Sequence, residues 1–281
     1  MNPTPQPLPG ARRPDAAAGG PSDPGALCPV AAKKRRSWWK TAAATALQQE
    51  YWMRLLAHLS DDDQERLRRD LVPIDLKCKR HLYDAHRKIE CVYFIESGVA
   101  SLVTIMQNGQ AAEVGTIGDE GFVGIPVLLG DERTPNAVYM QVPGKGMRMS
   151  VSKFREELER SPRLRDVLLH YAHAFFNTVA QSAACAHFHS LEQRCCRWLL
   201  MTLDRMPSPE FLLTHEFLAM MLGCRRAGVT EAMRTLRENG LVRYHHGEVT
   251  ILDREELERR SCECYAITKA EFDRLLAPPS G

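Results

Sequence analysis

Residues 214–247 read THEFLAMMLGCRRAGVTEAMRTLRENGLVRYHHG, and the organisation of the chain can be worked out from them. Apolar residues recur at helical spacing on both sides of Gly223, and Gly240 follows the second run. Thr214 suits a helix N-cap, and Gly223 permits a sharp turn. The pattern predicts two closely crossing helices, a helix-turn-helix, followed by a two-stranded wing over residues 241–252. The alternative is a helical hairpin with solvated arginines, and the adjoining wing favours the first interpretation.

The outer face of the second predicted helix carries the residues expected to contact DNA in the major groove. Arginines near its start suit guanine O6 and N7, and later arginines suit phosphates. The stretch holds five Arg against three Glu, yet residues 190–281 hold 13 Lys and Arg against 14 Asp and Glu. We therefore expect moderate, salt-sensitive binding through a local cluster. The candidate DNA-binding residues are Thr214, Arg225, Arg226, Gly228, Thr230, Glu231, Arg234 and His245.

Composition places the chain among ordinary globular proteins. Its 281 residues suffice for two domains, and 44% are hydrophobic and 26% charged. The sequence lacks a run of about 18 apolar residues, so we expect no transmembrane helix and no membrane partner. Nine cysteines without a C-x-x-C pair favour a reducing cytoplasm. Cys262-x-Cys264 is too closely spaced for the usual zinc knuckle, so we expect it to be structural and predict no metal site.

The N-terminal half changes from a Pro- and Gly-rich tail, expected to be disordered, to short alternating segments. Helices are expected over residues 48–59 and after Ser60. Asn108-Gly109 is the clearest hairpin signal between the strands that follow. Such regular spacing predicts a compact antiparallel barrel or roll, and hence an α+β fold in which the roll is followed by helices. The expected strands cover residues 72–76, 82–83, 92–95, 99–105, 112–117, 137–142 and 147–149.

A long helix is expected over residues 163–188, and heptad spacing within it predicts a dimerisation seam. The alternative is a helix that lies on the core of its own domain. A homodimer would read two half-sites of an operator. Capping boxes at Ser190 and Thr268 predict the start of the next helix and of the last one. The candidate seam residues are Leu164, Leu168, Tyr171, Phe175 and Thr178.

Five segments follow from these signals. They are a disordered tail (1–47), a β-roll sensor domain (48–161), a dimerisation helix (162–189), a winged helix-turn-helix DNA-binding domain (190–256) and a C-terminal helical tail (257–281).

The order of these elements resembles the Crp/Fnr (catabolite activator) family of bacterial transcription regulators. The resemblance covers roughly residues 51–257 and rests on VYFIESGVASL, GTIGDEGFVGIPVLLG and LTHEFLAMMLGCRRAGVTEAMRTLRENGLV. It implies that the roll is of cyclic-nucleotide-binding-like, jelly-roll type. It also implies a homodimer whose roll senses a signal and relays it along the long helix. Its C-terminal domain would bind a near-palindromic operator in double-stranded DNA, with RNA polymerase as a further partner.

The sequence departs from the family pattern at two places. Relatives that read the best-known half-site carry glutamate and arginine where this chain has Ala227 and Glu231, so the operator should differ. Cyclic-nucleotide binders carry a Gly-Glu pair where this chain has Gly124-Ile125-Pro126. An Arg-Thr pair, Arg133-Thr134, does follow, but it lies about two positions earlier in the sequence than the corresponding pair of those binders. The candidate effector residues are Gly121, Gly124, Arg133 and Thr134.

Two other classes of function compete with this interpretation. One is a sensor that binds metal or haem or responds to redox state, although the N-terminal cysteine cluster of the iron–sulfur oxygen sensors is absent. The other is an enzyme, for which the sequence offers no nucleophile elbow, P-loop or paired-acid site. The sequence names no cofactor. Possible ligands for the sensor are His170, His173, Cys185, His187 and His189.

Overall fold

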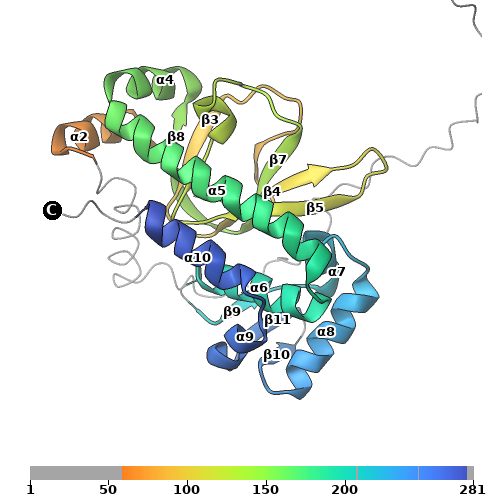
Figure 1. Ribbon diagram of the computed structural model, residues 1–281. Helices are drawn as coiled ribbons and strands as arrows, with labels where there is room; N and C mark the ends of the chain where they lie inside the picture. Colours follow the sequence, from red (N-terminus) through yellow and green to blue (C-terminus); the bar gives the residue numbers. More distant parts are fainter. Residues whose placement is uncertain (1–58, 207, 246, 277–281) are drawn as a thin grey trace, which may run out of the picture.

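The computed structural model describes residues 59–206, 208–245 and 247–276, and its N-terminal part is an antiparallel roll (Figure 1). One sheet has the strand order β1-β8-β3-β6 and the other β2-β7-β4-β5. The predicted roll and its seven strands are confirmed, and two-residue β6 was missed because it is too short to show alternation. The strands are β1 (Val72–Leu76), β2 (His81–Tyr83), β3 (Cys91–Ile95), β4 (Val99–Ile105), β5 (Ala111–Ile117), β6 (Phe122–Val123), β7 (Asn136–Val142) and β8 (Gly144–Ser150).

Three short helices flank the roll: α2 (Asp61–Asp70), α3 (Ile125–Leu128) and α4 (Val151–Arg160). The Ser60 side chain caps α2, as predicted. Apolar side chains from both sheets, including Val92, Phe94, Phe122 and Met140, fill a single buried core. The predicted tail over residues 1–47, and all of the predicted helix at 48–59 except Leu59, lie outside the described residues.

Helix α5 (Pro162–Phe188) crosses the roll, and α10 (Cys264–Leu275) lies alongside it (Figure 1). The predicted dimer seam is wrong, because all five of its residues face the inside of the same chain. Leu164, Leu168, Tyr171 and Phe175 belong to the core of the roll, and Thr178 is also buried. The heptad spacing therefore belongs to a helix that lies on the core of its own domain.

The C-terminal domain consists of α6, a winged helix-turn-helix and α9. A three-stranded sheet of order β10-β11-β9 forms the wing. Sequence inspection missed β9, which adds an edge strand to the predicted hairpin. The bounds are α6 (Leu191–Leu203), β9 (Glu210–Leu212), α7 (His215–Met221), α8 (Arg226–Glu238), β10 (Val242–His245), β11 (Glu248–Ile251) and α9 (Arg254–Arg260).

The roll and the C-terminal domain contact each other through both apolar and polar side chains. Val103 and Tyr139, from the roll, pack in the core of the C-terminal domain. Trp198 on α6 donates its indole N–H to Glu113 on β5 at 2.9 Å. Arg205, just after α6, forms a buried ion pair with Glu120 of the roll at 2.6 Å. The roll is therefore in direct contact with the domain expected to bind DNA.

The last two helices differ from the sequence expectation. The predicted boundary at residue 256 falls inside α9, whose Leu257 is fully buried in the C-terminal core. Helix α10 begins at Cys264, so Thr268 lies within the helix and is buried, and the predicted capping box there is wrong. None of the described helices has the length and apolar character needed to cross a membrane.

Candidate nucleic-acid interface

The turn between α7 and α8 has the geometry that the sequence predicted. The Thr214 hydroxyl accepts the N–H of Phe217 at 3.1 Å and so caps α7. Gly223 has φ +59°, a left-handed conformation in which a side chain would be strained. Ala219 is 5% exposed, where its small side chain lets the two helices approach. Arg194 of α6 donates to the carbonyl of Leu222 and braces the turn.

Helix α8 ends in a well-formed cap. Gly240 has φ +74°, its N–H donates to the Arg237 carbonyl at 3.0 Å, and Leu241 donates to the Leu236 carbonyl at 3.0 Å. This pair of bonds is a Schellman motif, which satisfies carbonyls that the helix end would otherwise leave unpaired. The motif also directs the chain into the wing. The outer face of α8 is therefore presented by a helix whose C-terminal end is well capped.

Two arginines stand at the beginning of this outer face. Arg225 is the N-cap residue of α8, Arg226 is its first residue, and both are exposed. The first turn of a helix also directs unpaired N–H groups outward, so positive charge and hydrogen-bond donors coincide there. Guanidinium groups at this position are suited to base edges or phosphates.

A small polar cluster joins α7, α8 and the wing. The His215 ring stacks on Tyr244 at 4.6 Å between centroids, and its Nδ1 lies 3.0 Å from the Thr230 hydroxyl. Burial lowers the pKa of His215, and the nearby charges of Arg226 and Arg237 lower it further. A neutral imidazole in this cluster therefore fixes the wing beside the outer face of α8. The sequence analysis did not single out His215, whose role depends on contacts distant in the chain.

Further along α8 the positive charge is partly compensated. Arg234 forms ion pairs with Glu231, three residues earlier, and with Glu238 at 3.9 Å. All three side chains are about half exposed or more, so these pairs exchange readily with solvent. Arg237, also exposed, lies further along the same helix. Phosphate would compete with these carboxylates for Arg234, which fits a contact to the DNA backbone.

Gly228, another predicted DNA contact, is half-buried. A side chain there would meet Leu191 Cδ2 at 2.8 Å, so this glycine allows α8 to pack closely on α6. His245 is exposed at the end of β10. Exposed Arg243 of the same strand, missed in the sequence analysis, lies 3.7 Å from Glu210 and adds a charge to the wing.

The four candidate effector residues lie in two different environments of the roll. A side chain at Gly121 would collide with the Tyr171 ring, and one at Gly124 would meet Val92 Cγ1 at 2.6 Å. Exposed Arg133 donates to the His86 carbonyl at 3.3 Å. Thr134 donates its hydroxyl to the Asn136 side chain. The two glycines therefore serve close packing, while Arg133 and Thr134 lie towards the surface of the roll.

The five possible ligands of a metal or haem sensor fall into two groups. His170, His173 and His187 are exposed on α5. Cys185 and His189, in contrast, lie close to Cys262 and Cys264, and all four ligand atoms fall within 4.8 Å of one another. Spacing along the chain does not reveal this cluster, because Cys185 and the Cys-x-Cys pair are more than 70 residues apart.

Two protein families match the chain, in the order that its structure shows. The cyclic nucleotide-binding domain family matches residues 74–161, which form the roll. The Crp-like helix-turn-helix domain family matches residues 193–260, from α6 to α9. No curated protein sequence matches the chain.

Solved structures share this architecture at low sequence identity. A transcriptional regulator assigned to the Crp/Fnr family from Eubacterium rectale is 17% identical, with a TM-score of 0.60, covering 74% of this chain and 98% of that one. FixK2 from Bradyrhizobium japonicum is 13% identical, with a TM-score of 0.59 and coverages of 68% and 98%. The c-di-GMP-responsive regulator CLP of Xanthomonas campestris is 14% identical, with a TM-score of 0.57 and coverages of 69% and 100%.

Proposed function

Because the chain belongs to the Crp/Fnr family of transcription regulators, which are not enzymes, we propose that it binds a near-palindromic operator as a homodimer. The observation that carries this proposal is the outer face of α8, with Arg225 and Arg226 exposed at its start and the helix capped firmly at its end. Such a face fits the major groove, and two copies related by a twofold axis would read two half-sites.

The operator should differ from that of the best-known relatives. Ala227 offers no acceptor for cytosine, and Glu231 pairs with Arg234 on the same helix. Direct readout would therefore fall mainly on the arginines at the start of α8. We further propose that the regulator acts in the cytoplasm together with RNA polymerase. The nine cysteines of the sequence include no C-x-x-C pair and do not form the pattern of a secreted disulfide framework, which favours a reducing compartment.

The dimer would form along a different stripe of α5 from the one predicted. Leu169 is 36% exposed and Phe176 is 68% exposed, and with exposed Ala183 they recur every seven residues. This apolar stripe lies on the side of α5 opposite to the roll core. An exposed apolar heptad on a long helix is suited to pairing with a second copy.

The signal would reach the DNA-binding domain through the contacts between the roll and α6. Glu120 and Arg205 pair at 2.6 Å with both side chains largely buried, so a shift of the Glu120 turn would be transmitted to the end of α6.

Selection of binding sites from random double-stranded DNA with the full-length protein tests the function. We expect enrichment of two inverted half-sites with their centres about one helical turn apart. A protein without α8 contacts to bases, such as Arg225→Ala with Arg226→Ala, should enrich no motif. The proposal of operator binding is wrong if the wild-type protein enriches no sequence at low or physiological salt, with or without cell extract as a source of effector.

A further inference from the structure

Four potential metal ligands meet where α5 ends and α10 begins. The sulfur atoms of Cys185, Cys262 and Cys264 and a ring nitrogen of His189 all lie within 4.8 Å of one another. The sulfurs of Cys185 and Cys262 are 3.5 Å apart, and Cys264 Sγ is 3.4 Å from His189 Nδ1. The three cysteines are free thiols and at most 4% exposed.

The fold brings these residues together from two directions. Cys185 lies in the last turn of α5, and His189 is the C-cap residue, whose N–H donates to the Cys185 carbonyl at 3.1 Å. Cys262 stands in the turn after α9, and Cys264 is the first residue of α10. Helix α10 lies along α5 (Figure 1), where Asn177 donates to the Glu271 carboxylate at 3.0 Å. The site thus links the long helix to the end of the C-terminal domain.

Simple packing does not account for this arrangement. Among the described residues the three thiols form a buried cluster of their own, separate from the apolar cores of the roll and of the C-terminal domain. Cys195 and Cys196, by comparison, are buried inside the C-terminal core and pack there as small apolar side chains. A separate cluster that also includes an imidazole nitrogen points to a ligand set.

The Sγ–Sγ distance of 3.5 Å and the Sγ–Nδ1 distance of 3.4 Å are close to those of a tetrahedral zinc site. Zn–S bonds of about 2.3 Å place two sulfurs about 3.8 Å apart, and a Zn–N bond of about 2.0 Å places nitrogen and sulfur about 3.5 Å apart. Three thiolates and one imidazole are a common donor set of structural zinc sites. Soft thiolate ligands in this number also disfavour Mg²⁺ and Ca²⁺, which bind oxygen.

Groups around the four ligands support this assignment. His189 directs Nδ1 to the thiols, and its Nε2 lies 3.1 Å from the Glu263 carboxylate, the usual partner of a zinc-bound histidine. Gln181 donates to Cys264 Sγ at 3.1 Å and would stabilise a thiolate. Buried Arg197 donates to the Ser182 hydroxyl at 2.8 Å, less than one turn of α5 before Cys185. Arg197 also offsets the net charge of −1 that three thiolates would leave on Zn²⁺.

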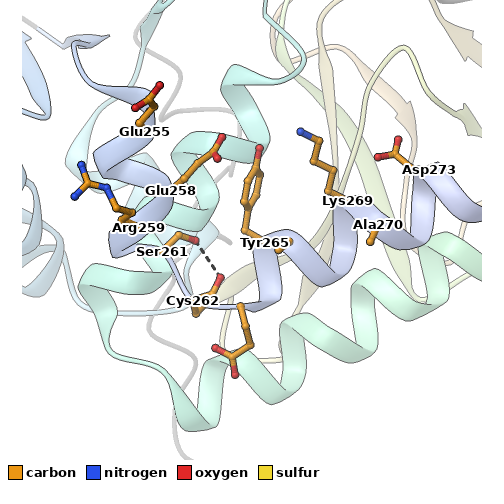
Figure 2. A pocket seen from close by; sticks show the side chains of 11 residues that line it. Glu255, Glu258, Arg259, Ser261, Cys262, Tyr265, Lys269, Ala270 and Asp273 are labelled. Atoms are coloured by element: carbon orange, nitrogen blue, oxygen red, sulfur yellow. Dashed lines mark hydrogen bonds between the residues drawn. The ribbon is translucent and has the colours of Figure 1, made fainter.

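A surface hollow gives solvent access to the cluster. It has a volume of about 760 Å³ and is lined by α9, the following turn and α10 (Figure 2). Figure 2 shows Ser261 and Cys262 in this turn, with Tyr265 at the start of α10 beside them. Cys262 and Glu263 both line the hollow, so a hydrated ion would meet a carboxylate and a thiol first.

We propose that Cys185, His189, Cys262 and Cys264 bind one Zn²⁺ ion. The ion holds the end of α5 against the α9–α10 turn, and so fixes the joint between the long helix and the C-terminal domain. Binding releases the thiol protons, so affinity increases with pH. The site stands independently of operator binding, because none of its ligands lies on the outer face of α8.

Metal analysis of the full-length protein, purified with reductant and without chelator, tests the site. We expect one equivalent of zinc per chain. Replacement by Co²⁺ should give the strong visible bands of a tetrahedral ion and a near-ultraviolet thiolate charge-transfer band. Less than about a tenth of an equivalent after reconstitution with Zn²⁺ under reducing conditions overturns the proposal. A zinc-free protein isolated with a Cys185–Cys262 disulfide overturns it too and identifies a redox pair.

Variants locate the ion. Cys262→Ser with Cys264→Ser should abolish binding, while Cys196→Ser, which alters a buried thiol outside the cluster, should keep the full equivalent. Glu263→Gln changes a side chain that is 67% exposed, so the fold should be retained, and zinc affinity should fall about 10–100-fold. If the double variant folds and retains the cobalt spectrum of the wild type, the ligands are assigned wrongly.

Discussion

Arg226 is the residue for which direct readout can be tested most clearly. It is exposed at the first position of α8, and its guanidinium is suited to guanine O6 and N7. We expect Arg226→Ala to weaken operator binding by about 1–3 kcal/mol more than binding to random DNA. Fluorescence anisotropy at several salt concentrations measures both affinities.

The matched control for this test is Arg237→Ala, which removes an exposed arginine near the far end of the same helix. That change should weaken operator and random DNA alike and reduce the salt slope by about one. Equal losses on both DNAs for Arg226→Ala would mean that Arg226 contacts only phosphate.

Glu113 should make stability depend on pH. Burial raises the pKa of its carboxyl from 4.5 to about 7, although the hydrogen bonds that it accepts offset part of this rise. Between these two values the unfolded chain loses a proton that the folded protein keeps, so the folded state becomes less stable as pH rises from about 4.5 to about 7. Thermal unfolding midpoints across this range should therefore fall.

The Glu113→Gln variant provides the comparison for this pH effect. An amide cannot ionise but can still accept the hydrogen bond from Trp198. The variant should be about as stable as the wild type at pH 4.5 and more stable at pH 8. If both proteins show the same change in midpoint with pH, Glu113 does not hold its proton in the folded state.

At the scale of elements, the exposed stripe of α5 should hold the dimer together. Leu169→Asp with Phe176→Asp would place four charges in a paired seam, where unpaired buried charges are very costly. Both side chains are exposed in the single chain, so the fold should survive. We expect a monomer by light scattering, with circular dichroism unchanged.

His170→Asp serves as the control, because this exposed residue of α5 lies away from the apolar stripe. That protein should remain dimeric. A dimeric Leu169→Asp, Phe176→Asp protein with unchanged circular dichroism would contradict this seam and direct the search to another surface.

At the scale of the whole molecule, the roll should not bind cyclic AMP in the usual manner of the family. A ribose hydroxyl and a phosphate need an acidic acceptor and an arginine, and a buried polar group left unpaired costs about 1–3 kcal/mol. Ile125 packs against the apolar core instead of offering an acceptor, and Arg133 is exposed and bonded to His86. Calorimetry with cyclic AMP and cyclic GMP should show no binding at micromolar concentrations.

Arg133→Ala makes the cyclic-nucleotide test decisive. A clear micromolar isotherm for the wild type that disappears in this variant would restore a cyclic-nucleotide sensor. An isotherm unchanged by the variant would also contradict the prediction and would place the ligand elsewhere on the roll.

Much of the fold could be predicted because its signals are local. The capping hydroxyls of Ser60, Thr214 and Ser190 each bond to a backbone N–H three residues ahead. Gly223 and Gly240 adopt the positive φ that their turns require. Such preferences act between residues at most a few positions apart, so they can be predicted from the sequence without the tertiary structure. The helix-turn-helix and the roll are of this kind.

Contacts between distant segments decided the rest. The period of α5 allows an apolar stripe on either side, and only packing on the roll shows that Leu168 and Phe175 face inward while Leu169 and Phe176 face outward. Thr268 resembles a cap, yet burial against other elements continues the helix through it. Each outcome depends on which surface covers a side chain, and that surface comes from residues far away in the chain.

The four candidate zinc ligands also show the difference between what the sequence predicts and what the tertiary structure decides. Cys185 and His189 are separated from Cys262 and Cys264 by more than 70 residues, and the intervening chain forms most of the C-terminal domain. Along the chain, Cys185 and His189 are two of five possible ligands, and Cys262-x-Cys264 is too closely spaced for the usual zinc knuckle. A tetrahedral ligand set depends on positions in space, and these were determined when α10 packed along α5 and buried the thiols between them.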